Sequence, residues 1–136
     1  MGQQQLLLLV LGIVIVGLAV VVGIQAFGEN QKKANLDAIV NDGIRIASDA
    51  QAWALKPTAF GGGEGNFCDG SSDTDPVSFA DLGIAADNVN ATYTIAQSGG
   101  CTGITITGTS KNGAGVVTVL VEGTNSDQIT TSIATS

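Results

Sequence analysis

The feature that most constrains this chain is an apolar run near its start. Residues 6–24 read LLLLVLGIVIVGLAVVVGI and hold only aliphatic side chains, Ala and Gly. No Asp, Glu, Lys or Arg occurs before Glu29. The run is close to the ~20 apolar residues that a helix needs to cross the hydrocarbon core of a bilayer. It therefore predicts a helix that has a membrane stage, with a separate polar domain behind it.

Three interpretations of this run compete: a secretory signal peptide, a lasting membrane anchor, and a helix that packs against copies of itself. A signal peptide requires a positively charged n-region. Residues 1–5, MGQQQ, contain no Lys or Arg. We therefore expect the run to stay in the mature chain, which leaves the anchor and the packing helix.

Small residues favour the packing helix. Gly12, Gly17 and Gly23 interrupt the run, and Ala19 forms a small-xxx-small pair with Gly23. Such residues let helix backbones approach closely where lipid supplies no hydrophobic driving force. Glycine is also common in membrane spans for other reasons. The spacing nevertheless predicts a surface on which copies of the helix meet.

The helical pattern continues beyond the apolar run. At 100° per residue, the apolar side chains between residues 36 and 54 share one face, and Asp, Asn, Arg and Ser fill the other. Pro57 stops the pattern. We expect one nearly continuous helix over residues 4–55, with residues 28–56 amphipathic. The residues expected to form its buried stripe are Leu36, Ile39, Val40, Ala47, Ala50 and Trp53.

The remaining segment, residues 57–136, predicts a small β head. A Gly-, Ser- and Asp-rich loop comes first, and the motif SFAD then predicts a short helix over residues 78–86. The period changes to two in ATYTIAQ, TGITITG and GVVTVLVEG, and QITTSIA offers a fourth strand. The sequence therefore predicts an α+β fold, in which a long N-terminal helix packs on a small antiparallel sheet.

Composition excludes several classes of function. The net charge is −7 with only 5 Lys and Arg residues, so no basic surface for nucleic acid is expected. The absence of His removes the commonest general base and the commonest metal ligand. We expect no enzymatic activity and no cofactor.

Cys68 and Cys101 are the two cysteines of the sequence. An even pair in a non-cytosolic setting indicates a disulfide, worth about 3–4 kcal/mol for a loop of this length in the chain-entropy model. Two buried thiols are the alternative. Lys32 and Lys33 behind the apolar run favour a cytoplasmic head by the positive-inside rule. The cysteines favour the opposite side, and we follow the cysteines.

Two further patterns predict weaker sites on the head. The first is an alternation of oxygen ligands that is typical of a calcium loop but lacks its Gly and its final Glu; it comprises Asp69, Ser71, Asp73 and Asp75. The alternative is a solvated acidic loop. The second is the glycosylation sequon Asn90-Ala91-Thr92.

This organisation resembles the type IV pilins and the pseudopilins of type II secretion. The shared features are the long apolar helix, its amphipathic second half, the connecting loop and the disulfide-linked sheet. The resemblance implies removal of a short leader, methylation of the new first residue and a Glu at the fifth position. Counted from Met1, that position holds Gln5. We expect its amide to accept a hydrogen bond from the terminal amine of a neighbouring copy in an unprocessed chain.

The resemblance implies a structural subunit of an extracellular pilus-like filament. Residues 1–27 would form the membrane and filament-core helix, 28–56 its continuation, and 57–136 the head. The expected partners are other copies of the chain, the membrane before assembly, and assembly machinery of the type IV pilus or type II secretion kind. A membrane-anchored pseudopilin or minor subunit is one alternative, and an adhesive head using the loop 61–75 is another.

Overall fold

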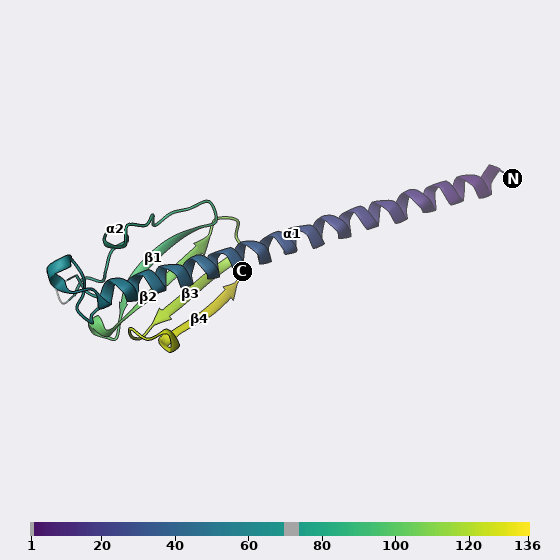
Figure 1. The fold of residues 1–136 in the computed structure, drawn as a ribbon. Helices are drawn as coiled ribbons and strands as arrows, with labels where there is room; N and C mark the ends of the chain where they lie inside the picture. Colours follow the sequence, from purple (N-terminus) through teal and green to yellow (C-terminus); the bar gives the residue numbers. More distant parts are fainter. Residues whose placement is uncertain (1, 70–73) are drawn as a thin grey trace. The chain divides into compact units, whose positions relative to one another are not determined.

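The computed structural model describes residues 2–69 and 74–136 (Figure 1). The chain divides into two compact units, Met1–Lys33 and Ala34–Ser136, and each is described by itself below. The first unit is helical throughout its described length. The second unit contains the rest of the same helix, a four-stranded sheet and the connecting loops. The fold class is α+β, as the sequence predicts.

Helix α1 extends over Gly2–Leu55. It therefore begins two residues earlier than expected and ends where expected. Gly28 lies inside it without a break, since the isolated glycine costs a helix only about 1 kcal/mol. Pro57 ends the helix in an extended conformation at φ −60° and ψ 147°.

The loop after α1 folds back over the end of the helix. The backbone N–H groups of residues 63, 64 and 65 donate to the carbonyls of Trp53, Lys56 and Ala54 at 3.2, 3.0 and 2.6 Å. Carbonyls at a helix C-terminus have no partner inside the helix, so this loop supplies what α1 lacks. The glycine at 63 is required there, because a β-carbon built on it would lie 2.0 Å from the Asn66 carbonyl oxygen.

Helix α2 is shorter than the sequence predicts. It covers Phe79–Leu82, not 78–86. The expected capping box is present: Asp81 N–H donates to the Ser78 hydroxyl, and Asp81 Oδ2 accepts from Ser78 N–H at 2.9 Å. Gly83 adopts the left-handed conformation at φ 68° and closes the helix after one turn. The helix is shorter than expected because its C-cap, Gly83, lies only two residues after the motif that starts it.

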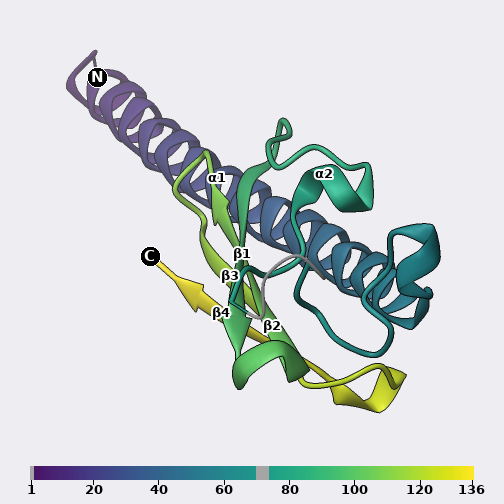
Figure 2. The same cartoon turned by 90° about the vertical axis from the view of Figure 1, so that its left-hand side faces the viewer.

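The sheet is an antiparallel meander in the order β1-β2-β3-β4 (Figure 2). Its strands are β1 (Ala91–Ser98), β2 (Gly103–Ser110), β3 (Gly115–Val121) and β4 (Ile129–Thr135). The fourth strand expected from QITTSIA is therefore present. Asn112 and Gly113 form the β2–β3 turn, with Gly113 at φ 72°, which confirms the hairpin signal in the sequence.

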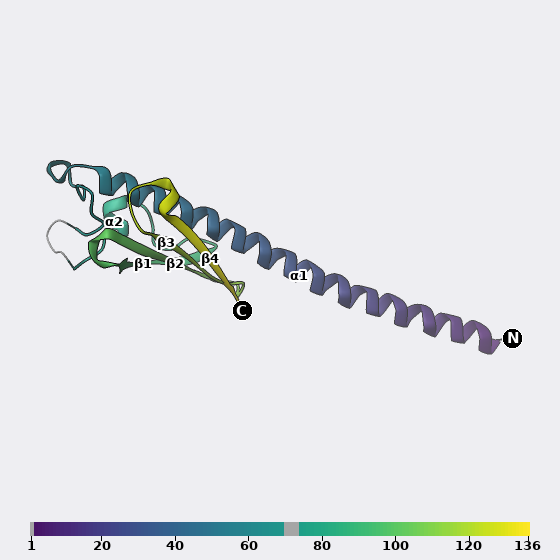
Figure 3. The same ribbon diagram turned by 90° about the horizontal axis from the view of Figure 1, so that it is seen from below.

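Residues 34–55 of α1 lie across one face of this sheet (Figure 3). The buried side chains of that face alternate along β1, β2 and β3 and meet the apolar stripe of the helix. Within the described residues, the helix contributes Leu36, Ile39, Ile46, Ala47, Ala50, Trp53 and Ala54 to the core, and the sheet contributes Ala91, Tyr93, Ile104, Ile106, Val117, Val119 and Val121. Val40 is half-buried and packs against this core. Threonines dominate the opposite face, as expected for a sheet with one solvated side.

Two glycines let the helix approach the sheet closely. A β-carbon built on Gly43 of α1 would lie 2.8 Å from Val119 Cγ2, and one built on Gly108 of β2 would lie 2.7 Å from Ile39 Cγ2. Any larger residue at either place would displace a packed neighbour. The distance between the layers is therefore set by the absence of two side chains.

Candidate functional site

The largest apolar surface of the described chain lies on the first unit. Every large aliphatic side chain from Leu6 to Ile24 is more than half exposed, and so is Phe27. α1 is the one helix, among the residues the structure describes, that is long and apolar enough to cross a membrane. An apolar surface of this extent is far larger than soluble monomers leave in water, and it marks a membrane or protein contact. It is the strongest candidate for a functional surface on the chain.

The five residues predicted to pack between copies all lie on this exposed helix. They are Gln5, Gly12, Gly17, Ala19 and Gly23. Apart from the adjacent residues and the nearby backbone of the helix itself, no atom of the described residues lies within 4 Å of a β-carbon built on any of the three glycines. The space beside them is therefore open to a partner helix, and the role of the five residues stays a prediction.

Cys68 and Cys101 form the predicted disulfide, with their Cα atoms 5.2 Å apart. The bridge joins the loop before α2 to the β1–β2 connection. Beside it, Phe67 N–H donates to the Cys101 carbonyl at 2.8 Å, and the Phe67 side chain is fully buried. The bridge therefore holds a buried aromatic of the long loop against the end of the sheet.

The predicted calcium loop lies only partly within the described residues. Ser71 and Asp73 fall outside them, in residues 70–73. Asp69 N–H donates to the Asp75 carbonyl at 3.0 Å, which closes the ends of the loop. No group of three or more metal-binding side chains is found in residues 2–69 and 74–136. Calcium binding stays a prediction.

The predicted glycosylation sequon lies where the chain enters β1. The Asn90 carbonyl accepts from Asn35 Nδ2 at 3.4 Å and from Lys111 N–H at 3.1 Å. The Thr92 hydroxyl, which a glycosylated sequon presents beside the Asn, donates to Asp87 Oδ1 at 2.7 Å. The sequon is therefore part of a bonded turn and not of a loose loop.

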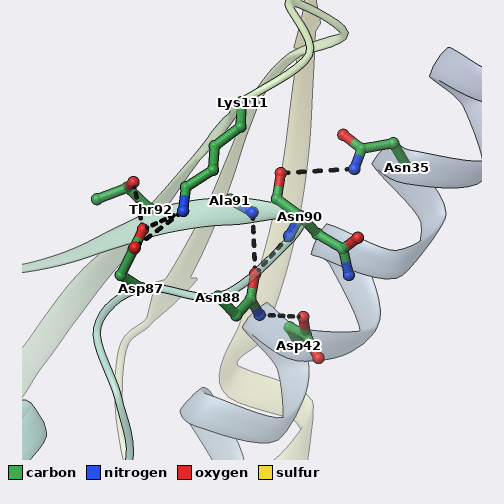
Figure 4. A network of polar contacts seen from close by, with 8 residues as sticks. All are labelled: Asn35, Asp42, Asp87, Asn88, Asn90, Ala91, Thr92 and Lys111. Atoms are coloured by element: carbon green, nitrogen blue, oxygen red, sulfur yellow. Dashed lines mark hydrogen bonds and ion pairs between the residues drawn. The ribbon is translucent and has the colours of Figure 1, made fainter.

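A polar network around this turn was not anticipated from the sequence (Figure 4). Asn88 Nδ2 donates to Asp42 Oδ2 of α1 at 2.8 Å, and the Tyr93 hydroxyl donates to the same oxygen at 3.0 Å. Lys111 of the hairpin lies 2.8 Å from Asp87. The side chain of Lys111 bonds to Asp87 and, together with the Thr92 hydroxyl, holds the pKa of this carboxyl below its usual value. Burial, reinforced by Asp42, raises the pKa of Tyr93 to about 12.

A hollow of about 330 Å³ lies beside this network, lined in part by Asp42, Arg45, Ile84 and Tyr93. Its buried polar atoms already bond to one another through the Asp42 carboxylate. No buried side-chain donor or acceptor without a partner is found in the described chain. The network therefore fastens the turn to α1.

Gln51 is a buried polar residue that the predicted helical stripe does not include. It is 8% exposed, and its Nε2 donates to the carbonyls of Gly123 and Asn125, both at 2.8 Å. These carbonyls belong to the loop between β3 and β4. One feature of the sequence could have indicated this role: a glutamine at the border of an apolar helical stripe has a side chain long enough to reach a neighbouring loop.

Comparison of the chain with protein-family models, with curated proteins and with solved structures finds no match. The class is therefore defined by architecture alone. A long N-terminal apolar helix packed on a four-stranded antiparallel sheet is a pilin-like architecture. The apolar helix suggests membrane association or secretion, and the disulfide fits a location outside the cytoplasm.

Proposed function

We propose that this chain is the structural subunit of an extracellular, pilus-like filament that is held together by packing of its N-terminal helices. The observation that carries the proposal is the exposed aliphatic surface of residues 6–24. Its exposure to water would cost tens of kcal/mol at about 25 cal/mol per Å². The surface therefore has to lie in lipid or against other proteins.

Other copies of the chain are the favoured final partner. Lipid holds a single apolar helix without any need for small residues, whereas close helix pairs use them. Ala19 and Gly23 are one turn apart, and Gly12 and Gly17 have open space beside them. Identical subunits that meet by a rotation that does not close form an open helical filament. A membrane stage before assembly and machinery of the type IV pilus or type II secretion kind complete the proposal.

Electron microscopy of the cells that make the protein tests the proposal. Filaments are expected that label with an antibody against the head and disappear when residues 2–24 are deleted. A sharper variant is Ala19→Leu with Gly23→Leu, which fills the close-packing surface while keeping the helix apolar. Val20→Leu is the matched control and is expected to leave the filaments intact.

Each outcome separates the proposal from its alternatives. Membrane-bound protein with no filaments would contradict it and favour a membrane-anchored pseudopilin. Filaments in which the chain is only a sparse component would favour a minor subunit. Intact-mass measurement of filament subunits then shows whether residues 1–2 are retained, as the proposed role of Gln5 requires.

A further inference from the structure

The turn before β1 presents an apolar residue outward from a rigid base. Val89 is 92% exposed. Its neighbour Asn88 accepts from the backbone N–H of Asn90 at 2.9 Å and donates to Asp42 of α1 at 2.8 Å. Figure 4 shows this turn fastened both to the helix and to the hairpin residue Lys111. A protruding valine that the described residues leave uncovered, on a turn held by these bonds, is suited to contact with another molecule.

The opposite edge of the sheet carries an open strand. Within the described residues, β4 pairs with β3 alone. Its sequence, ITTSIAT, contains neither a charged residue nor a proline. Residues of these two kinds usually protect an exposed edge strand from pairing with another chain. The β1 edge is different, because Tyr93 N–H donates to the Ala86 carbonyl at 2.7 Å and Asp87 bridges to Thr92. The open backbone edge therefore lies on the β4 side.

Two apolar side chains accompany this edge. Ile133 of β4 is 51% exposed and pairs with Val117, whose side chain faces α1. Ile44 of α1 is 40% exposed. It lies two helical turns before Gln51 and so shares the side of the helix that reaches the β3–β4 loop. We call the surface of Ile44 and Ile133 the β4 flank, and that of Val89 and the turn 87–90 the β1 flank.

The two flanks lie at the same level along α1. Ile133 is in register with Val117, which pairs with Gly108. Gly108 lies against Ile39 of α1. On the other edge, the Val89 turn bonds to Asp42 through Asn88. Both apolar surfaces are therefore level with residues 39–42 of the helix, where two copies with parallel helices can bring them together.

The two flanks differ in charge, because the β1 side carries both signs and the β4 flank carries carboxylates alone. The Lys and Arg residues of unit 34–136 are Arg45, Lys56 and Lys111. All three lie on the β1 side together with carboxylates, because Arg45 pairs with Asp49, Lys111 pairs with Asp87, and the hollow near α2 that Arg45 and Lys56 line also contains Asp81. The β4 flank has Asp37, two turns before Ile44 on the same side of the helix, and Glu122 and Asp127 near the strand ends.

We infer that the β1 flank of one copy docks on the β4 flank of the next in the filament, with Val89 against Ile133 and Ile44. This inference rests on the proposed function and assigns a second, head-to-head contact to it. The contact is heterologous, since two different surfaces meet, and so it extends along a polymer. Pairing of two β4 flanks would place Asp37, Glu122 and Asp127 of both copies together, which like-charge repulsion disfavours.

Engineered cysteines test the contact in assembled filaments. The two native cysteines bond to each other, so new thiols have no background. The variant carrying both Val89→Cys and Ile133→Cys is expected to form a ladder of cross-linked species on a non-reducing gel. Each single variant is expected to stay monomeric on the gel, because a heterologous contact never brings two identical positions together.

Three results would overturn the inference. Filaments without a ladder in the double variant would remove the contact and leave the proposed function standing. Dimers from either single variant would show an isologous contact instead. Absence of filaments in the unaltered chain would remove both the proposed function and this contact.

Charge insertion provides an independent readout. Val89→Asp and Ile133→Asp are each expected to abolish filaments while the thermal unfolding midpoint of the monomer in detergent stays unchanged. Phe60→Asp is the matched control, because Phe60 is 73% exposed but lies in the loop after α1, away from both flanks. Wild-type filament yield from Val89→Asp and Ile133→Asp would contradict the inference.

Discussion

Gly43 of α1 lies over Val119 of β3, so close that a β-carbon on residue 43 would come within 2.8 Å of Val119 Cγ2. Helix propensity alone would favour Ala at this place by up to about 1 kcal/mol. Close packing reverses that preference, because the stiff valine side chain has to move. The residue at position 43 therefore fits the packing of α1 against the sheet better than it fits helix propensity.

We expect Gly43→Ala to lower the free energy of unfolding by about 1–2 kcal/mol, as overpacked cores usually do. Chemical denaturation of the full chain in detergent measures this. The double variant Gly43→Ala with Val119→Ala is expected to lose less stability than the sum of the two single variants. Simple additivity would contradict direct contact between residues 43 and 119.

Gln51→Met is expected to cost about 1–3 kcal/mol, because the Gly123 carbonyl loses its side-chain donor and the Asn125 carbonyl keeps only the backbone N–H of Gln128. Hydrogen exchange should also rise in the β3–β4 loop. Asn41→Leu on the exposed side of α1 is the control and should change stability by less than about 0.5 kcal/mol. Equal effects of the two substitutions would show that Gln51 does not hold the loop.

The hydroxyl of Tyr93 predicts a loss of stability at high pH. Its pKa is raised from 10.0 to about 12 in the folded chain, by burial first and by Asp42 second. The folded state therefore favours the protonated phenol, and its contribution is complete below pH 10 and lost as the pH rises towards 12. Unfolding free energy should fall across this window.

Tyr93 is the only tyrosine, so tyrosinate absorbance reports its titration alone. Asp42→Asn should lower the midpoint, because a neutral amide no longer opposes the phenolate. Tyr93→Phe should remove the pH dependence between 10 and 12 that comes from this group. An unshifted midpoint in the unaltered protein would contradict the burial of the Tyr93 hydroxyl, and an unchanged midpoint in Asp42→Asn would contradict its hydrogen bond to Asp42.

Replacement of both cysteines by Ala is expected to lower the free energy of unfolding by about 3–4 kcal/mol, the chain-entropy value for a sequence separation of 33. Denaturation with and without reductant should show the same difference in the unaltered chain. A reductant effect that persists in the double variant would point to a cause other than the bridge between Cys68 and Cys101.

The elements with strong periodicity could be predicted from the sequence. The apolar run is long enough to form a helix by itself, and it is exposed all round. The stripe from Leu36 to Trp53 and the alternation in the strands each bury one face, so the pattern that forms these elements also decides what they pack against. The pairing of Cys68 with Cys101 followed because no other cysteine exists. The candidate assembly surface was predictable for the same reason, since an exposed aliphatic run has few physical destinations.

Features that depend on distant residues could not be predicted. The bond of Asn88 to Asp42 joins positions 46 residues apart, and that of Gln51 to Asn125 joins positions 74 apart. Nothing local distinguishes these amides from other surface amides. The length of α2 was missed because Gly83 is as common inside loops as at helix ends, and only the backbone conformation shows which role it takes.

The meander order of the sheet has a consequence for how the head is made. Each strand pairs only with strands that are adjacent to it in the chain, so each new strand can pair with the one already made, without waiting for distant segments. Cys68 and Cys101 both precede β3 and β4. Oxidation can therefore lock the early half of the domain while the last two strands are still emerging, which shortens the period in which a half-made sheet is open to unwanted association.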